Sequence, residues 1–301
     1  MIANFMQPEE LSRLRSLELR ARAVVEGYLQ GMHRSPFVGF SVEFSSHRKY
    51  EAGDDLRHVN WKLYARNRKL YVKEFDAETN MNLYLLVDNT ASMNCKAGGP
   101  MSKRDYASVI AASLSHVGMR QRDSVALAML GDGIQTYLDP SAKPQQWQDC
   151  LRVLQTTPVT VKSSLGRSLQ QCALLAKSRG LVVLISDLIE DLEHDPTEEI
   201  EQGLERLRFQ GHEVVVFHVL DPWERSLPKQ GRSRFIDPES AFELTSEMET
   251  IRVAYGQRID AWTKKLESIC LDQRIDRIEL TTDTPPSRAL VDYLVKRTTM
   301  G

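Results

Sequence analysis

Short apolar runs alternate with longer amphipathic stretches from Met81 to the end of the chain. The runs are typical of strands buried on both faces, and the stretches between them repeat apolar residues at helical spacing. The expected strands are residues 82–87, 124–130, 134–138, 181–186, 213–219 and 277–281, and the expected helices are residues 105–119, 144–154, 165–178, 196–209, 246–271 and 287–297. This alternation predicts an α/β fold with an open, doubly wound and mostly parallel sheet.

One connection between strands is too short for a parallel crossover. Gly131, Asp132 and Gly133 separate two strand-like runs, and glycines in so short a link favour a tight hairpin. The second run is therefore expected to be an antiparallel edge strand. Ser102 is a residue type that often caps helices, and Asp105 follows it at capping-box spacing, so a helix is expected to begin there.

The first eighty residues follow a different pattern. Residues 9–29 repeat apolar positions at helical spacing, and their polar face mixes acidic residues with arginines. That mixture favours packing on the protein's own core over a membrane surface. Residues 31–76 hold glycines, aromatics and many charges, with short strand-like pieces at 40–44 and 70–75. We expect residues 1–80 to form an N-terminal helix and an irregular lead-in segment, and residues 81–301 to form the sheet domain.

The composition argues against nucleic-acid-binding, disulfide-rich and membrane-spanning proteins. The chain has 301 residues, 42% of them apolar, and a net charge of -2 with a pI near 6.4, so nothing global favours nucleic acid as a partner. The four cysteines form no Cys-x-x-Cys pair, which fits a reducing compartment. No signal peptide is visible, and no apolar stretch reaches the ~20 residues that cross a bilayer. We expect a cytoplasmic protein without direct membrane insertion, attached to membranes, if at all, through a partner.

Two of the expected strands end in aspartate, at Asp88 and at Asp187. In open α/β sheets, ligands bind outside the carboxyl ends of strands, near the point where the winding direction reverses. Asp88 begins an Asp-x-Thr-x-Ser loop, in which Thr90 and Ser92 offer two hydroxyl oxygens beside the carboxylate. Mg²⁺ prefers oxygen ligands and usually retains several waters, so few protein ligands suffice. The sequence therefore predicts a divalent-cation site.

A pair of serines later in the chain and the common capping role of strand-end aspartates both affect the prediction of a cation site. Ser163 and Ser164 lie at the start of a later helix. Either of them could offer a further hydroxyl to the cation, so Ser164 is a rival for Ser163 as a ligand. An aspartate after a strand is also often only the N-cap of the next helix, and Thr and Ser are ordinary turn residues. For Asp88 alone the two interpretations are balanced. The second strand-end carboxylate, Asp187, favours the metal site.

These loops resemble the metal-ion-dependent adhesion site of the von Willebrand factor A fold. That site has an Asp-x-Ser-x-Ser loop, a Thr in a second loop and an Asp in a third. Asp88, Thr90 and Ser92 match the first loop with Thr in place of its first Ser, Ser163 stands where the Thr is expected, and Asp187 matches the third. The resemblance implies a von Willebrand factor A-like sheet holding Mg²⁺, or Mn²⁺ or Ca²⁺, whose shell a partner's carboxylate often completes.

The lead-in segment carries the most specific resemblance, to the domain of unknown function 58 family. The matching residues are Gly31-x-His33-Arg34-Ser35, Gly39-Phe40-Ser41-x-Glu43-Phe44, Tyr50-x-x-Gly53-Asp54-Asp55-x-Arg57-x-x-Asn60-Trp61 and Ala65-Arg66. Asn60 replaces the family's usual Asp before the Trp. From the residues themselves, Asp54, Asp55, Arg57 and Arg66 are interpreted as an ion network that clamps the segment to the sheet, with direct ligand binding as the alternative. The resemblance also implies a MoxR-type AAA+ ATPase as partner and a chaperone-like role in assembly or maturation of client proteins.

The leading hypothesis is therefore a non-enzymatic, protein-binding adaptor. The alternative is a metal-dependent phosphohydrolase on a similar sheet. Aspartyl-phosphate enzymes need a second carboxylate at the position of Thr90, and no phosphate-binding Gly-rich loop is present either. A third hypothesis is a structural domain whose site has lost its metal. The residues indicate neither the client nor the oligomeric state.

Overall fold

A six-stranded sheet forms the centre of the computed structural model, which describes residues 5–33, 47–49, 68, 70–73, 81–161, 164–189, 197–236, 243–291 and 293. Its strands are β3 (Asn82–Asp88), β4 (Ser124–Gly131), β5 (Gly133–Ser141), β6 (Gly180–Ser186), β7 (Glu213–Leu220) and β10 (Asp276–Thr281). They lie in the order β10-β7-β6-β3-β4-β5 and all pairs are parallel except β4 with β5. The predicted doubly wound sheet with one antiparallel edge strand is confirmed.

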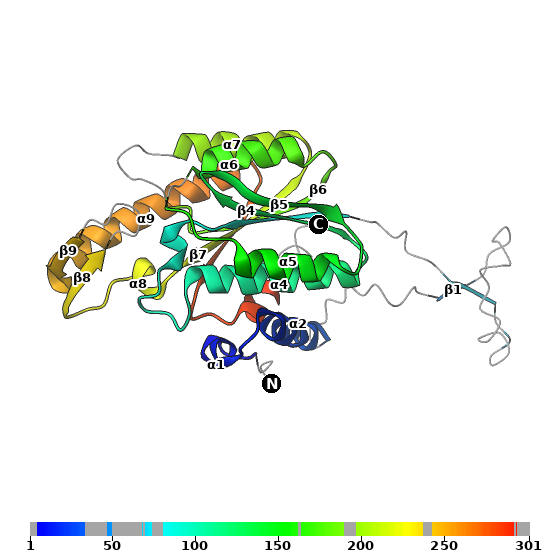
Figure 1. Ribbon diagram of the computed structural model, residues 1–301, viewed down its shortest axis with the longest axis horizontal. Helices are drawn as coiled ribbons and strands as arrows, with labels where there is room; N and C mark the ends of the chain where they lie inside the picture. The colour runs from blue at the N-terminus through cyan, green and yellow to red at the C-terminus, as the bar shows by residue number, and fades with distance from the viewer. Residues whose placement is uncertain are drawn as a thin grey trace.

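Helices cover both faces of this sheet (Figure 1). α4 (Lys103–Arg120) and α5 (Gln146–Thr156) lie on one face, and α6 (Leu165–Leu175), α7 (Thr197–Phe209) and α9 (Met248–Asp272) contribute to the core on the other. The chain builds β3, β4 and β5 in one direction and then returns past β3 to add β6, β7 and β10. The winding direction therefore reverses between β3 and β6.

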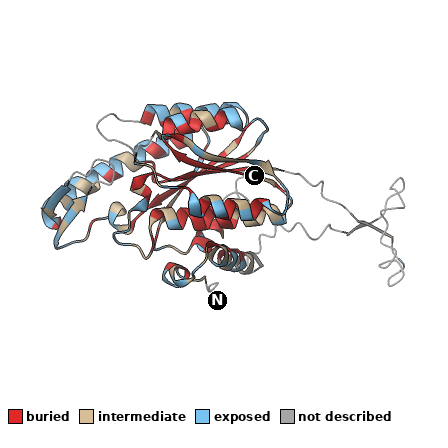
Figure 2. Cartoon of the chain, in the orientation of Figure 1, coloured by how far each residue is buried: buried red, intermediate tan, exposed pale blue. Residues whose placement is uncertain are grey.

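The strands are buried on both faces because successive side chains point to opposite faces of the sheet and are apolar on both. In β3, Leu83, Leu85 and Val87 belong to the core beneath α4, while Tyr84 and Leu86 belong to the core beneath α6 and α7. Figure 2 shows the consequence: the sheet is buried between layers whose outer helix faces are exposed. Full burial of one such side chain contributes about 1.5–3 kcal/mol to folding.

The N-terminal segment corrects one prediction. Residues 9–29 were expected to form one helix, but α1 (Pro8–Arg13) and α2 (Leu17–His33) are separate. Ser16 Oγ accepts a hydrogen bond from the N–H of Leu19 at 3.1 Å, and the Arg20 guanidinium donates to the carbonyl of Leu14 at 2.9 Å. These side chains satisfy backbone groups that an unbroken helix would have paired internally. The buried face of α2 joins the same core as α4.

Several other elements were not predicted from the sequence. They are the 3-10 turn η2 (Ala91–Asn94), the short helix α8 (Pro222–Arg225) and the antiparallel pair β8 (Arg232–Ile236) and β9 (Glu243–Glu247). In the lead-in segment, β1 (His47–Lys49) pairs with β2 (Tyr71–Lys73), which falls inside the strand expected at 70–75. The strand expected at 40–44 and the network of Asp54, Asp55, Arg57 and Arg66 lie outside the described residues.

Candidate functional site

Three carboxylates gather where the central strands end. Asp88 is the last residue of β3, Asp187 follows β6 directly, and Asp221 follows β7 directly. Because β3 and β6 pair in parallel with Val87 opposite Ile185, Asp88 lies beside Ser186 and Asp187 follows one position later at the same edge. This edge is the carboxyl edge at the winding reversal, where doubly wound sheets bind their ligands.

Asp88 is buried, with 3% of its surface exposed. Its Oδ2 accepts a hydrogen bond from the Ser186 hydroxyl at 2.5 Å, and its Oδ1 accepts one from the N–H of Thr90 at 3.0 Å. Burial and then the charge of Asp187 raise the pKa of Asp88 to about 6, against the opposing effect of these hydrogen bonds. The charged form of Asp88 is therefore disfavoured, because the hydrogen bonds around it do not fully offset its burial and the nearby charge of Asp187.

Thr90 and Ser92 turn their hydroxyls toward each other, with the two oxygens 3.0 Å apart. Thr90 is the N-cap of η2, so the chain curls immediately after it and brings Ser92 to the same side. Thr90 is buried, whereas Ser92 is partly exposed. The structure thus places the two hydroxyls beside the Asp88 carboxylate, with Ser92 more exposed than Asp88 and Thr90, and the binding of a cation by these residues stays a prediction.

The second loop lies against the first. The N–H of Thr160 donates to the carbonyl of Asn89 at 3.2 Å, and the Arg104 guanidinium bridges the Asn89 side chain at 2.7 Å and the carbonyl of Thr157 at 2.6 Å. Ser163 lies outside the described residues, so its place in the site stays a prediction. Its rival Ser164 caps α6 and donates its backbone N–H to the carbonyl of Gly131 at 3.1 Å.

Lys103 is a member of the site that was not predicted. Its ammonium donates to Oδ2 of Asp187 at 2.6 Å and to Oε1 of Glu224 in α8 at 2.5 Å, and the lysine side chain has no exposed surface. Burial alone lowers the pKa of Lys103, but the two carboxylates outweigh it and raise the pKa above its usual range. The loop that carries Asp187 therefore already contacts one positive charge, the Lys103 ammonium. A signal existed in the sequence, because a lysine at the first position of a helix is unfavourable beside the helix dipole unless acids lie nearby.

The loop after β6 is also fixed through its backbone. Asp187 Oδ1 accepts from the N–H of Ile189 at 3.0 Å, and its carbonyl lies 2.9 Å from Nε2 of His218. The Arg277 guanidinium can only donate, and it lies 2.7 Å from Nδ1 of His218, so Nε2 carries the proton and donates to Asp187. Burial, together with Arg277, lowers the pKa of His218 to about 4 and keeps the ring neutral.

Asp221 ties the loop after η2 to the end of β7. Its carboxylate accepts hydrogen bonds from the N–H groups of Ala97, Gly98 and Gly99 at 2.7 to 3.1 Å, and from that of Trp223 at 2.9 Å. Glu224 completes a capping box by accepting from the N–H of Asp221 at 2.8 Å. Asp221 is thereby engaged by backbone donors, while Glu224 turns its other oxygen to Lys103.

The residues present fit a hard divalent cation at Asp88, Thr90 and Ser92, since they offer one carboxylate and two hydroxyls in one place. The charges also favour a cation, because Asp88, Asp187, Asp221 and Glu224 are four carboxylates at this edge and the Lys103 ammonium contacts two of them, Asp187 and Glu224. Within the described residues no three His, Cys, Asp or Glu side chains are grouped to hold a metal ion. A cation here would therefore rely on hydroxyl oxygens.

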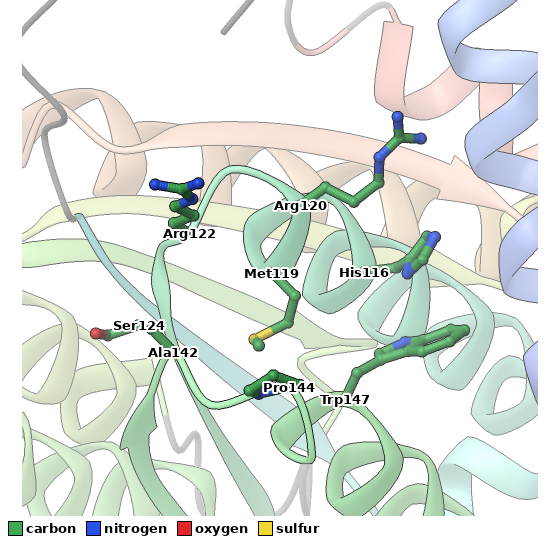
Figure 3. A pocket seen from close by; sticks show the side chains of 8 residues that line it. All are labelled: His116, Met119, Arg120, Arg122, Ser124, Ala142, Pro144 and Trp147. Carbon is green, nitrogen blue, oxygen red and sulfur yellow. The ribbon is translucent and has the colours of Figure 1, made fainter.

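A cavity of about 680 Å³ lies at the opposite, amino edge of the sheet (Figure 3). It is lined by His116, Met119, Arg120, Arg122, Ser124, Ala142, Pro144 and Trp147. Trp147 already donates its indole N–H to the carbonyl of Ala112 at 3.1 Å, and both guanidinium groups extend to one side of the cavity. This cavity lies away from the loops that carry Asp88, Asp187 and Asp221.

None of the helices in the described part of the chain has the length and apolar surface needed to cross a bilayer. That finding concerns the described helices alone. The cytoplasmic location stays a prediction.

The sheet order and the three-loop edge define a von Willebrand factor A-like domain. A crystal structure of the conserved hypothetical protein BatB from Bacteroides thetaiotaomicron has the same fold, with a TM-score of 0.50 and 12% identity over 73% of this chain and 99% of that one. The model of the family described as Protein of unknown function DUF58 matches residues 46–264, and the chain belongs to that family. The predicted family and fold are confirmed.

Among curated proteins, an uncharacterized protein of Mycobacterium tuberculosis is 27% identical over 238 residues, which cover 77% of this chain and 72% of that protein. An uncharacterized protein of Mycobacterium bovis matches equally well. The crystal structure of the SpRpn10 VWA domain matches with a TM-score of 0.41 and 10% identity over 70% of this chain and 94% of that one.

Proposed function

We propose that this protein is a non-enzymatic adaptor that binds a protein partner at the carboxyl edge of its sheet. The partner would supply a carboxylate to a divalent cation held by Asp88, Thr90 and Ser92. The observation that carries the proposal is the convergence of these oxygens at one edge of the sheet, where the carboxylates outnumber the Lys103 ammonium. The von Willebrand factor A-like fold, a class made mainly of interaction domains, supports a binding role.

The position of each oxygen suits such a role. The carboxylate of Asp88 is buried and would stay with the ion, while Ser92 faces solvent, from which a partner would approach. Mg²⁺ keeps several waters when the protein provides few ligands, and one of these waters can be exchanged for a partner's oxygen. Mn²⁺ or Ca²⁺ would accept the same oxygen ligands.

The partner in this proposal is a MoxR-type AAA+ ATPase together with a client protein, in a chaperone-like assembly or maturation step. This part of the proposal rests on the family resemblance of the lead-in segment. The site's chemistry adds one requirement, namely that the partner presents an acidic side chain or a carboxyl terminus to the loop of Asp88, Thr90 and Ser92.

Capture of the purified MoxR-type ATPase of the same organism by the full chain, with Mg²⁺ or with EDTA, tests the proposal. Asp88→Asn keeps the side-chain volume and removes the charge, so it should abolish capture. Asp132→Asn at the β4–β5 turn is the matched control, because this aspartate is exposed on the same edge and its carboxylate forms a surface ion pair with Arg167 at 3.1 Å. Capture that survives both EDTA and Asp88→Asn would reject the cation-dependent adaptor.

No observation favours the phosphohydrolase alternative. The residue two positions after Asp88 is Thr90, and its hydroxyl bonds to Ser92 rather than replacing the second carboxylate that such enzymes use as acid and base. Turnover of a phosphate ester with Mg²⁺ that is lost in Asp88→Asn would reverse this ranking.

A further inference from the structure

The first turn of α4 places a positive charge among the carboxylates at the carboxyl edge of the sheet. Lys103 occupies the first position of that helix and has no exposed surface. A buried ammonium is stable only when negative charge lies nearby and its N–H groups have hydrogen-bond acceptors. Two carboxylates from different elements, Asp187 and Glu224, provide both here. The lysine thereby links α4, the loop after β6 and α8.

The same contacts occupy Asp187. Its Oδ2 accepts from Lys103 and its Oδ1 accepts from the N–H of Ile189, so both oxygens are engaged within the chain. The oxygens of the first loop are in a different situation. Thr90 and Ser92 bond to each other, and the donors to the Asp88 carboxylate in the described part of the chain are neutral: the Ser186 hydroxyl and the N–H of Thr90. A cation bound by Thr90 and Ser92 would therefore meet the Asp88 carboxylate without a cationic partner, whereas the Asp187 carboxylate is already paired with Lys103.

We propose that Lys103 is a resident counter-ion that holds Asp187 out of the metal's ligand shell and weakens divalent-cation binding at Asp88, Thr90 and Ser92. This inference rests on the cation site of the proposed function, and it assigns Lys103 a positioning role toward that site. Removal of the ammonium then frees Asp187 to act as a ligand and removes a repulsive charge from beside the ion.

A purely structural ion pair would behave differently. A buried pair that only connects elements can be replaced by apolar groups at little cost, without any consequence for cation affinity. The two roles therefore separate on cation binding, measured with the metal alone, and not on stability.

The test is calorimetric titration of the full chain with Mn²⁺ and with Mg²⁺. The informative variant is Lys103→Met combined with Glu224→Gln, because it removes one positive and one negative charge and leaves the net charge around Asp88 and Asp187 unchanged. We expect this double variant to bind Mn²⁺ about tenfold tighter or more, which equals about 1.4 kcal/mol. Adding Asp187→Asn to the double variant should return the affinity toward that of the wild type.

Lys96→Met is the matched control for loss of a lysine, because Lys96 is exposed on the loop after η2. Its charge is screened by solvent, so its removal should change Mn²⁺ affinity less than about threefold. An unchanged or weaker affinity in the double variant would overturn the inference, as would a gain that persists after Asp187→Asn.

A second comparison keeps Lys103 in place, in case its replacement prevents folding. Asp187→Asn and Glu224→Gln each remove one carboxylate partner of the ammonium. If Asp187 is held out of the ligand shell, the two variants weaken Mn²⁺ binding by similar factors. A loss about tenfold larger in Asp187→Asn than in Glu224→Gln, or more, would identify Asp187 as a direct ligand and overturn the inference.

The cation titrations and the partner-capture experiment can fail independently of each other. Binding in the double variant but not in the wild type supports the role of Lys103 and rejects a cation in the native adaptor. Absence of binding in both overturns the inference. Partner capture that persists in EDTA counts against the proposed function alone.

Discussion

The hydroxyl of Ser186 donates a 2.5 Å hydrogen bond to Oδ2 of Asp88, across the parallel pairing of β6 with β3. Both side chains are buried, and the same Ser186 oxygen accepts from the N–H of Leu188 at 2.9 Å. The serine therefore stabilises the charged form of Asp88 and at the same time fixes the turn that carries Asp187.

Ser186→Ala should lower the free energy of unfolding by about 1–3 kcal/mol at pH 8, because a buried carboxylate loses a donor and a buried N–H loses an acceptor. The loss should be smaller at pH 5, where Asp88, with a pKa of about 6, takes up a proton. Urea denaturation at both pH values measures it. Ser115→Ala is the control, since this buried hydroxyl donates to the carbonyl of Ala112 at 2.9 Å. An equal loss at both pH values in Ser186→Ala would contradict the expectation.

The sheet and the first loop were predictable because their signals are local. Continuous apolar runs specify buried parallel strands, and the glycines at 131 and 133 specify the hairpin. Once parallel order is assumed, Asp88 and Asp187 must leave the same edge. The break between α1 and α2 was not predictable in this way, because the Arg20 side chain satisfies carbonyls that a periodicity argument assigns to an unbroken helix.

Lys103 illustrates why the rest of the site was missed. Whether a lysine at the start of a helix is exposed depends on what covers it, and here the cover is α8, more than a hundred residues later in the chain. Asp221 and Glu224 carry a capping-box spacing that marks α8 as a helix start. That pattern does not reveal that Glu224 turns its second oxygen to another element.

Neutral His218 should make the protein sensitive to acid. Its folded pKa of about 4 lies below the ordinary value of 6.5, so the stability it contributes is present above pH 6.5 and is lost as the pH falls toward 4. At about 1.4 kcal/mol per pKa unit, the loss is at most about 3–4 kcal/mol. His218→Gln keeps a donor for the carbonyl of Asp187 and should lose less stability between pH 7 and pH 4. Urea midpoints of both proteins across this range test it, and parallel pH profiles would contradict it.

Mg²⁺ should stabilise the wild-type protein if its site binds the ion. Ligand binding to the folded state alone adds about 2.7 kcal/mol at a free concentration one hundred times the dissociation constant. Thermal unfolding in Mg²⁺ and in EDTA should therefore differ for the wild type and for Asp132→Asn, but not for Asp88→Asn. A Mg²⁺-dependent shift of equal size in all three would place the ion elsewhere.

Two glycines test how tightly the loop after η2 is held. A Cβ on Gly99 would overlap the Thr282 hydroxyl, and its N–H donates to Asp221 at 3.1 Å, so Gly99→Ala must displace the loop from the end of β7. We expect it to cost about 1–3 kcal/mol of folding free energy, as overpacking of a filled position does. Gly256 in α9 has open space around its Cβ position, so Gly256→Ala should add about 0.5–1 kcal/mol through helix propensity. Opposite shifts of the urea midpoint are therefore expected from the same chemical change, and a neutral Gly99→Ala would show that the loop is not fixed by Asp221.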